Sequence, residues 1–251
     1  GNDGGVFRST DGGETFESCN GGYQTSQFYG GFSSAETDSQ LSMGGFQDNS
    51  TAVYDGQPIW RVHLGGGDGG WTAIHPTDPQ IMYASAQFLQ LAKSTNGLQS
   101  FVILSVPNVS GGPTVFIAPY VLAKDNPNIL YAGRELIYKS TDGGFNWSTR
   151  GINTFLDGNP FLAMAISPQN SDVVYAATAP LAADPGVFRT TDGGVSWDSI
   201  NGNLPNRFPG DLHVDPNNEA TVYITMMGFG SSHVFKSNDY GSTWQDIDNG
   251  G

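Results

Sequence analysis

Two glycine-rich stretches of the chain contain the side chains best suited to bind a cation. Gln47-Asp48-Asn49 and Gly67-Asp68-Gly69 place carboxylate and amide oxygens beside glycines, which expose backbone carbonyls. Ca²⁺ takes about six to eight oxygen ligands, so Asp48 and Asp68 are the candidate calcium ligands of this sequence. The same residues are also typical of two tight turns, and we favour the turns.

Tryptophans on either side of the second stretch point to a different chemistry. Trp60 and Trp71 offer flat apolar faces on which a sugar ring can stack, although aromatic side chains also commonly pack between layers of sheet. Nearby carboxylates and amides would exchange hydrogen bonds with sugar hydroxyl groups. The candidate ligand-binding residues are therefore Gln47, Asp48, Trp60, Asp68, Trp71 and Glu135.

A hydrolytic site needs a pair of carboxylates. One protonates the leaving oxygen of a glycosidic bond while the other attacks or activates water. The carboxylates in predicted connecting loops are Asp48, Asp68, Glu135 and Asp157, and for each we favour a solvated or turn-capping role. The four histidines lack metal-ligand spacing, and the single cysteine, Cys19, permits neither a disulfide within the chain nor a cysteine metal site. We assign no catalytic residue.

The charge balance excludes several classes of partner. Lysine and arginine number 10 against 24 aspartates and glutamates, a formal net charge of −14. Such a surface lacks the basic footprint that nucleic acids and anionic membranes attract. No stretch approaches the roughly 18 apolar residues of a membrane span. Glycine accounts for 35 of 251 residues, which is typical of short strands joined by many turns.

A repeated turn sequence indicates the fold. Ser9-Thr10-Asp11-Gly12-Gly13-Glu14-Thr15-Phe16 recurs around Asp142 and Asp192, and in a variant form around Asp239. A degenerate copy has Asn96 in place of the aspartate and lacks the second glycine. A second signature places an apolar residue nine positions before a tyrosine, at Tyr83, Tyr131, Tyr175 and Tyr223.

The spacing of these signatures predicts a β-propeller. The four tyrosines follow one another at intervals of 48, 44 and 48 residues. A period of about 40–50 residues with four short strand patterns is typical of propeller blades. We predict a single all-β domain of four-stranded antiparallel blades, with five full blades and about half of a sixth. The predicted blades span residues 1–21 (partial), 22–64, 65–114, 115–159, 160–207 and 208–251.

The repeated turn has a local physical explanation. Its aspartate can accept hydrogen bonds from backbone N–H groups of its own hairpin, and the following glycines permit positive φ. The closing Trp or Phe is expected to pack between neighbouring blades. We therefore interpret four aspartates as structural residues of outer hairpin turns, away from the central channel: Asp11, Asp142, Asp192 and Asp239.

The pattern S/T-x-D-G-G-x-T/S-W/F resembles the Asp box, or bacterial neuraminidase repeat, over essentially the whole chain. Sialidases, xyloglucan-active glycoside hydrolases, sortilin-type receptors and secreted bacterial proteins share this pattern. Resemblance to sialidases implies an arginine cluster, yet only Arg61, Arg134, Arg150 and Arg207 lie outside the repeat and the Phe/Tyr-Arg-Ile-Pro motif is absent. Resemblance to xyloglucan-active enzymes implies one carboxylate from each of two propellers, and this chain predicts one propeller.

Three functional interpretations remain open. The first is a non-catalytic extracellular or cell-surface module that binds a glycan or a protein, and the second is a fragment of a xyloglucanase-like glycoside hydrolase. The third is a subunit of an extracellular assembly. Because the sequence starts within a predicted blade, strands from outside residues 1–251 are expected to complete that blade, either from the same chain or from neighbouring copies by strand addition. Asn49, Asn108 and Asn146 are possible glycosylation sites.

Overall fold

The protein consists of short antiparallel strands joined by tight turns. The computed structural model describes residues 6–19, 21, 27–57, 61–64, 67–109, 111–151, 156–230 and 232–248. The strands of these residues form five four-stranded sheets and one two-stranded sheet. The only helical segment in this part of the chain is a 3-10 turn, η1 (Gln87–Leu89). The prediction of an all-β protein with four-stranded antiparallel blades is confirmed.

Each four-stranded sheet is a meander in which strands adjacent in sequence are paired. The first two sheets comprise β3 (Ser33–Ser34), β4 (Leu41–Phe46), β5 (Ser50–Asp55) and β6 (Arg61–Leu64), then β7 (Gly69–Ile74), β8 (Met82–Ala86), β9 (Gln90–Ser94) and β10 (Val102–Leu104). The third comprises β11 (Tyr120–Leu122), β12 (Leu130–Gly133), β13 (Ile137–Ser140) and β14 (Ser148–Arg150). The last two comprise β15 (Phe161–Ile166), β16 (Val174–Thr178), β17 (Val187–Thr190) and β18 (Asp198–Ser199), then β19 (Pro209–Asp215), β20 (Asn218–Met226), β21 (Val234–Ser237) and β22 (Gln245–Asp246).

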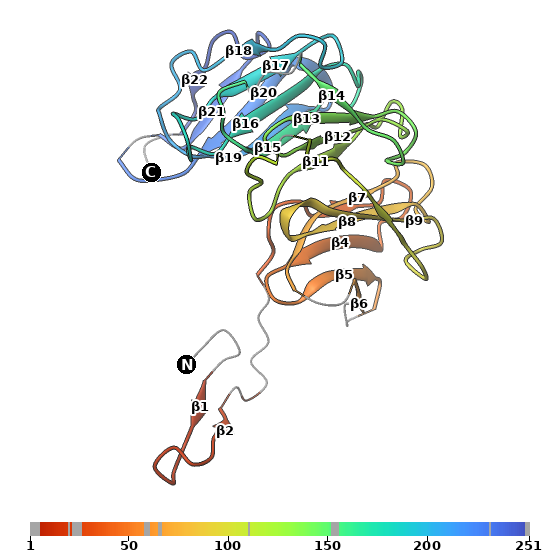
Figure 1. The fold of residues 1–251 in the computed structure, drawn as a ribbon, viewed down its shortest axis with the longest axis vertical. Helices are drawn as coiled ribbons and strands as arrows, with labels where there is room; N and C mark the ends of the chain where they lie inside the picture. Colours follow the sequence, from red (N-terminus) through yellow and green to blue (C-terminus); the bar gives the residue numbers. More distant parts are fainter. Residues whose placement is uncertain are drawn as a thin grey trace.

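Neighbouring sheets pack face to face, with their inner strands in contact. β4 lies against β7, and β15 lies against β19. Figure 1 shows the sheets following one another in chain order without closing into a ring. The sequence predicted a propeller around a central channel, whereas the described sheets form an open row.

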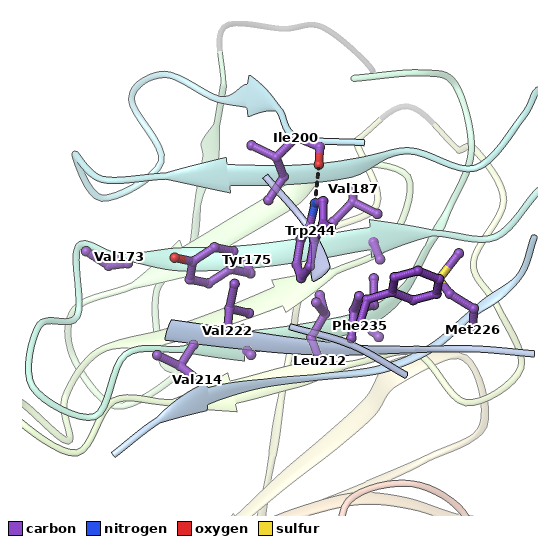
Figure 2. Close-up of a cluster of buried hydrophobic side chains, with 14 residues drawn as sticks. Val173, Tyr175, Val187, Ile200, Leu212, Val214, Val222, Met226, Phe235 and Trp244 are labelled. Atoms are coloured by element: carbon purple, nitrogen blue, oxygen red, sulfur yellow. Dashed lines mark hydrogen bonds between the residues drawn. The ribbon is translucent and has the colours of Figure 1, made fainter. Parts of the chain in front are cut away.

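The core lies between the sheets. Every residue of β16 is buried, because a neighbouring sheet covers this strand on either side. The core between the last two sheets joins Val187 and Ile200 to Leu212, Phe235 and Trp244, and Figure 2 shows these side chains filling the space between the strands. Close packing of this kind leaves few voids, so removal of large side chains from this layer is costly.

Tyrosines on the second strand of three sheets reach across to the next sheet. Their hydroxyl groups donate to backbone carbonyls, Tyr83 to Gly143 at 3.3 Å, Tyr131 to Ser171 at 3.0 Å and Tyr175 to Glu219 at 3.2 Å. Burial, with the charge of Asp142 adding to it, raises the pKa of Tyr83 to about 12, so this phenol stays protonated and keeps donating. Three of the four periodic tyrosines of the sequence are therefore links between sheets.

The repeated turns around Asp11, Asp142, Asp192 and Asp239, which we call box turns, join the third and fourth strands of the sheets or the two strands of the N-terminal hairpin. The carboxylate of Asp192 accepts the backbone N–H and the hydroxyl of Ser196 at 2.9 and 2.6 Å. The hydroxyl of Thr190 donates to Asp192 at 2.7 Å and accepts the N–H of Gly194 at 2.9 Å. Burial alone would raise the pKa of Asp192, but the hydrogen bonds from Ser196 and Thr190 hold it at about 2. The same arrangement occurs at Asp11, Asp142 and Asp239.

The closing aromatic side chains do not all pack as the sequence predicted. Trp244 is buried, and its indole N–H donates to the carbonyl of Ile200 in the preceding sheet at 2.8 Å. Phe16 and Phe101, in contrast, are 65% and 44% exposed. Phe16 lies in the hairpin of β1 (Phe7–Arg8) and β2 (Glu17–Ser18), which pairs with no other described strand and stands apart from the sheets in Figure 1.

Candidate functional site

The connections of the meanders divide the sheets into two ends. In a four-stranded antiparallel meander, the turn between the second and third strands lies at the same end as the link to the next sheet. The box turns lie at the other end, because they join the third and fourth strands. We call the first end the loop face, and its turns between second and third strands include residues 47–49, 87–89, 134–136, 179–186, 227–230 and 232–233.

Asp68 is a buried carboxylate of the loop face, immediately before β7. Its side chain is 8% exposed. One oxygen accepts the backbone N–H of Asp48 at 3.1 Å, and the other accepts the side-chain amide of Gln87 at 3.0 Å. The hydroxyl of Tyr29 also bonds to Asp68, and burial together with this bond raises the pKa of Tyr29. Three donors therefore surround the carboxylate that the sequence offered as a calcium ligand.

This geometry favours the turn interpretation of the two glycine-rich stretches. Asp48 presents its backbone N–H to Asp68 and adopts a φ of 57° in an exposed turn. The described ranges contain no group of three or more acidic, histidine or cysteine side chains that could hold a metal ion. Half-buried Gln47 belongs to the same turn, where its carbonyl accepts the side-chain amide of Asn49 at 2.9 Å. Asp68 organises the meeting of two turns, and Asp48 lies beside it as an exposed carboxylate.

Exposed aromatic side chains lie next to this network. Phe88 and Phe116 stand edge to face with ring centroids 5.4 Å apart, and Tyr29 meets Phe116 at 6.4 Å. Phe88 and Phe116 are 52% and 43% exposed although both are large and apolar. Phe88 also has a φ of 55°, a left-handed conformation that is uncommon outside glycine. We call Tyr29, Phe88 and Phe116 the aromatic platform.

Arg134, from the β11–β14 sheet, holds the turn that carries Phe88. Its guanidinium donates to the carbonyl of Phe88 at 3.1 Å, to the hydroxyl of Thr114 at 3.2 Å and to the carbonyl of Val106 at 3.5 Å. The N–H of Phe88 donates to the carbonyl of Phe116 at 2.8 Å. Burial lowers the pKa of Arg134, whereas the charge of Glu135 opposes that shift. The strained turn is therefore tied to two other segments of the loop face.

The remaining loop carboxylates are engaged within the chain. Glu135 is 1% exposed, and one of its oxygens accepts the hydroxyl of Tyr138 at 3.5 Å. Asp157 accepts the hydroxyl of Thr178 at 2.5 Å and the backbone N–H of Asn159 at 2.9 Å. The bond from Asn159 fits a turn-capping role for Asp157. Glu135 differs from the expectation, because it is buried and its contact is to a tyrosine side chain. Of the four candidate carboxylates, Asp48 is the exposed one.

Trp71 lies in a different place from the aromatic platform. It is half-buried in β7, where it packs against the backbone of Gly30 and Gly31. With Phe32 and Tyr120 it lines a cavity of about 320 Å³ beside the inner strands β3, β7 and β11. Trp60 lies outside the described residues. The structure thus brings Asp48, Asp68 and Gln47 together, whereas Trp71 lines a cavity to which none of these three contributes.

The three sequon asparagines are exposed. The amide nitrogen of Asn146, which a glycan would modify, donates to the carboxylate of Asp142 at 2.6 Å. That nitrogen is part of a box turn. Asn49 and Asn108 donate to carbonyls of their own loops.

The sequence predicted neither the aromatic platform nor the role of Arg134 in holding the turn of Phe88. Three separate loops supply the platform, so no local motif marks it. Phe88 has a left-handed backbone conformation at a turn position where glycine is usual, and nothing in a single sequence indicates this. The one available hint was that Arg134 lies outside the repeat, so the repeat does not explain its presence.

The sequence resembles two characterised proteins over part of its length. No protein-family model matches it. It is 26% identical over 200 residues to a xyloglucanase of Hypocrea jecorina, covering 77% of this chain and 22% of that protein. It is 38% identical over 64 residues to the photosystem II assembly lipoprotein Ycf48 of Synechococcus, covering 26% of this chain and 17% of that protein. The chain thus spans less than a quarter of the length of either relative.

Solved structures share the architecture. An ancestral GH74 enzyme aligns with a TM-score of 0.68 and 19% identity, covering 92% of this chain and 33% of that one. The GH74 enzyme of Niastella koreensis aligns with a TM-score of 0.64 and 19% identity, covering 86% and 38%. A chain of the mitotic checkpoint complex aligns with a TM-score of 0.61 and 10% identity, covering 84% and 61%. No helix of the described residues is long and apolar enough to cross a membrane. At these identities the likeness shows a β-propeller fold.

Proposed function

We propose that this chain is a non-catalytic extracellular or cell-surface propeller module that binds a neutral glycan through the aromatic platform. The observation that carries this proposal is Phe88, which is half-exposed and held in a left-handed conformation by hydrogen bonds from Arg134 and to Phe116. Backbone strain of this kind costs about 1–3 kcal/mol and persists where the surroundings impose it, commonly at functional sites. An extracellular location is supported by the resemblance to secreted Asp-box proteins.

A glycan suits this site better than a charged ligand. The carbon-bound hydrogens of a pyranose ring stack well on exposed aromatic faces. A charged ligand would cover less of this apolar surface. The exposed carboxylate of Asp48 lies beside the platform and can accept hydrogen bonds from sugar hydroxyl groups. A formal net charge of −14 also disfavours polyanions.

Titration with soluble xyloglucan, followed by calorimetry, tests this function. Phe88→Ala and Phe116→Ala should each weaken binding about tenfold or more, because each removes apolar area that the sugar would bury. Phe145→Ala is the matched control, since Phe145 is 59% exposed but lies in a box turn at the opposite end. Equal binding by all three variants would remove the platform from the proposal, and no binding of any neutral glucan by the wild-type chain would remove the function.

A fragment of a xyloglucanase-like glycoside hydrolase is the second candidate. The 26% identity to a xyloglucanase supports it. Under this alternative, Asp48 is the carboxylate that this chain would contribute to a pair, because Asp68, Glu135 and Asp157 are committed to contacts within the chain. Release of reducing ends from xyloglucan by this chain, lost in Asp48→Asn, would favour the hydrolase over the binding module.

A further inference from the structure

A second concave site lies on the loop face, between the last two sheets. It is a pocket of about 230 Å³ formed by the loop before β17, the link between β18 and β19, and the end of β20. Val187 and Met226, both labelled in Figure 2, belong to its apolar lining. Pro185, Leu204 and Pro205 add to that lining. This pocket shares no residue with the aromatic platform.

Arg207 is the cationic group of this pocket. Its guanidinium lies against the backbone of Gly228 and Gly230, which have φ of 114° and 77°. A Cβ at Gly228 would come within 2.4 Å of a terminal nitrogen of Arg207, so the glycine is needed for this approach. Arg207 is half-buried, and within the described part of the chain no carboxylate or carbonyl accepts a hydrogen bond from it. A half-buried guanidinium without an acceptor is costly unless a ligand supplies one.

No described carboxylate forms an ion pair with Arg207. His233 lies nearby, and its ring nitrogens are 2.9 Å from the carbonyl of Gly228 and 3.1 Å from the carboxylate of Asp248. Both partners are acceptors, so the doubly protonated ring satisfies both contacts. Asp248 is matched to His233, while Asp184, also a lining residue, forms no ion pair with Arg207. With a net charge of −14, the protein would repel an acidic run at long range but would admit a single carboxylate.

Exposed apolar side chains lie next to pocket residues in the sequence. Phe208 and Met227 are 45% and 50% exposed and are joined through a backbone hydrogen bond of 2.7 Å. Phe229, between the two glycines that contact Arg207, is 92% exposed. Phe208, adjacent to Arg207 in the chain, is therefore an exposed apolar side chain close to the cationic group.

We propose that this pocket binds a peptide segment of a protein partner that presents one carboxylate next to a large apolar side chain. The carboxylate pairs with Arg207, and the apolar side chain covers Phe208 and Met227. A peptide is favoured over an acidic sugar, because proline and aliphatic side chains such as Leu204 and Met226 make up much of the lining. The amide of Asn201 is already used, as it accepts the N–H of Val187 at 2.7 Å and donates to the carbonyl of Pro185 at 3.2 Å.

The probes for a test are N-acetyl-L-phenylalanine, its neutral amide and D-glucuronate. Each is titrated into the isotope-labelled full chain while the backbone amide signals of Gly228 and Gly230 are followed by NMR. The acid should shift both signals in a saturable way, and the affinity should fall at high salt. Arg207→Gln should weaken its binding about tenfold or more, the usual effect of losing charge-assisted hydrogen bonds. Lys124→Gln is the matched control, since it also removes one positive charge but lies in a surface ion pair with Glu36.

Three outcomes would overturn the proposal. Equal binding of the acid and its amide would show that the carboxylate is not recognised. Unchanged affinity in Arg207→Gln, with the fold intact by circular dichroism, would remove Arg207 from the site. Stronger shifts with glucuronate than with the acetylated amino acid would identify an acidic glycan as the ligand class. None of these results depends on xyloglucan binding at the aromatic platform.

Discussion

Each box turn is organised by one aspartate together with the hydroxyl of the residue two positions before it. The degenerate copy shows how far the chemistry can vary. The amide oxygen of Asn96 accepts the N–H of Ser100 and the hydroxyl of Ser94, both at 3.0 Å, and its amide nitrogen donates to the hydroxyl of Ser100 at 2.9 Å. The hydroxyl of Ser100 thus accepts a hydrogen bond, whereas the equivalent hydroxyl of Ser196 donates one to Asp192. The turn therefore needs the oxygen and the shape of the side chain more than the negative charge.

This comparison predicts the effect of substituting Asp192. Asp192→Ala should lower the free energy of unfolding by about 1 kcal/mol, because backbone donors lose their acceptor at a largely exposed turn. Asp192→Asn should cost less than half as much, since Ser196 can reverse as Ser100 does. Urea unfolding at neutral pH measures both. Glu14→Gln, an exposed substitution in another box turn, should leave stability unchanged.

The pH dependence of the box carboxylates follows from their low pKa values. Hydrogen bonds from Asn146 hold the pKa of Asp142 at about 2, and bonds from Thr243 and Ser237 do the same for Asp239. Because an unfolded aspartate has a pKa of about 3.9, these groups stabilise the fold above about pH 4 and lose that contribution as the pH falls through about 2. Asp192→Asn should flatten part of this acid slope. An unchanged slope would show that these carboxylates do not drive acid unfolding.

Arg134 is a single residue whose loss should loosen the aromatic platform. Arg134→Gln removes three hydrogen bonds that reach Phe88, Thr114 and Val106. The backbone amide of Phe88 should then exchange with deuterium about tenfold faster, because its strained turn loses its support. Arg8→Gln, on the exposed hairpin, is the control. Unchanged exchange at Phe88 would mean that packing against Phe116 alone fixes the turn.

At the scale of strands and sheets, the tyrosine links explain why the repeat includes a tyrosine at a fixed interval. Tyr131→Phe removes a buried bond of 3.0 Å to the carbonyl of Ser171 and leaves the ring in place. The free energy of unfolding should fall by about 1 kcal/mol. Tyr223→Phe is the matched control, because Tyr223 lies on the second strand of the last sheet and donates no hydrogen bond to another described sheet. A similar loss in both variants would assign the effect to the ring environment instead.

The strands themselves were largely predictable, because their pattern is local. In the β15–β18 sheet, the segment leading directly into the repeated turn forms the third strand, Val187–Thr190. The outer strand spans only Asp198–Ser199, because the box turn occupies the residues before it. The aromatic platform could not be predicted, since its residues come from three loops that only the packing of sheets brings together. The exposure of Phe16 was also missed, because an aromatic residue can pack between sheets only where a neighbouring sheet is present.

At the scale of the whole molecule, the open row of sheets has two chemically different ends. At the box end, the polar groups of each turn are hydrogen-bonded within the turn itself. The loop face, in contrast, carries the strained Phe88, the half-buried Arg207 and the exposed Asp48. Loops on a rigid scaffold are the usual location of binding residues. A low count of cations in an acidic molecule makes Arg207 stand out as a local exception. We expect ligands to be bound at the loop face and not at the box end.

Hydrogen–deuterium exchange of the full chain with and without xyloglucan tests this account most directly. The account predicts added protection at residues 87–89 and 114–117, which carry the aromatic platform, and unchanged exchange in the box turns around Asp142 and Asp192. Phe88→Ala should abolish the added protection without altering exchange in the box turns. Protection that appears in the box turns, or that persists in Phe88→Ala, would contradict the claim that this propeller binds glycans through its loop face.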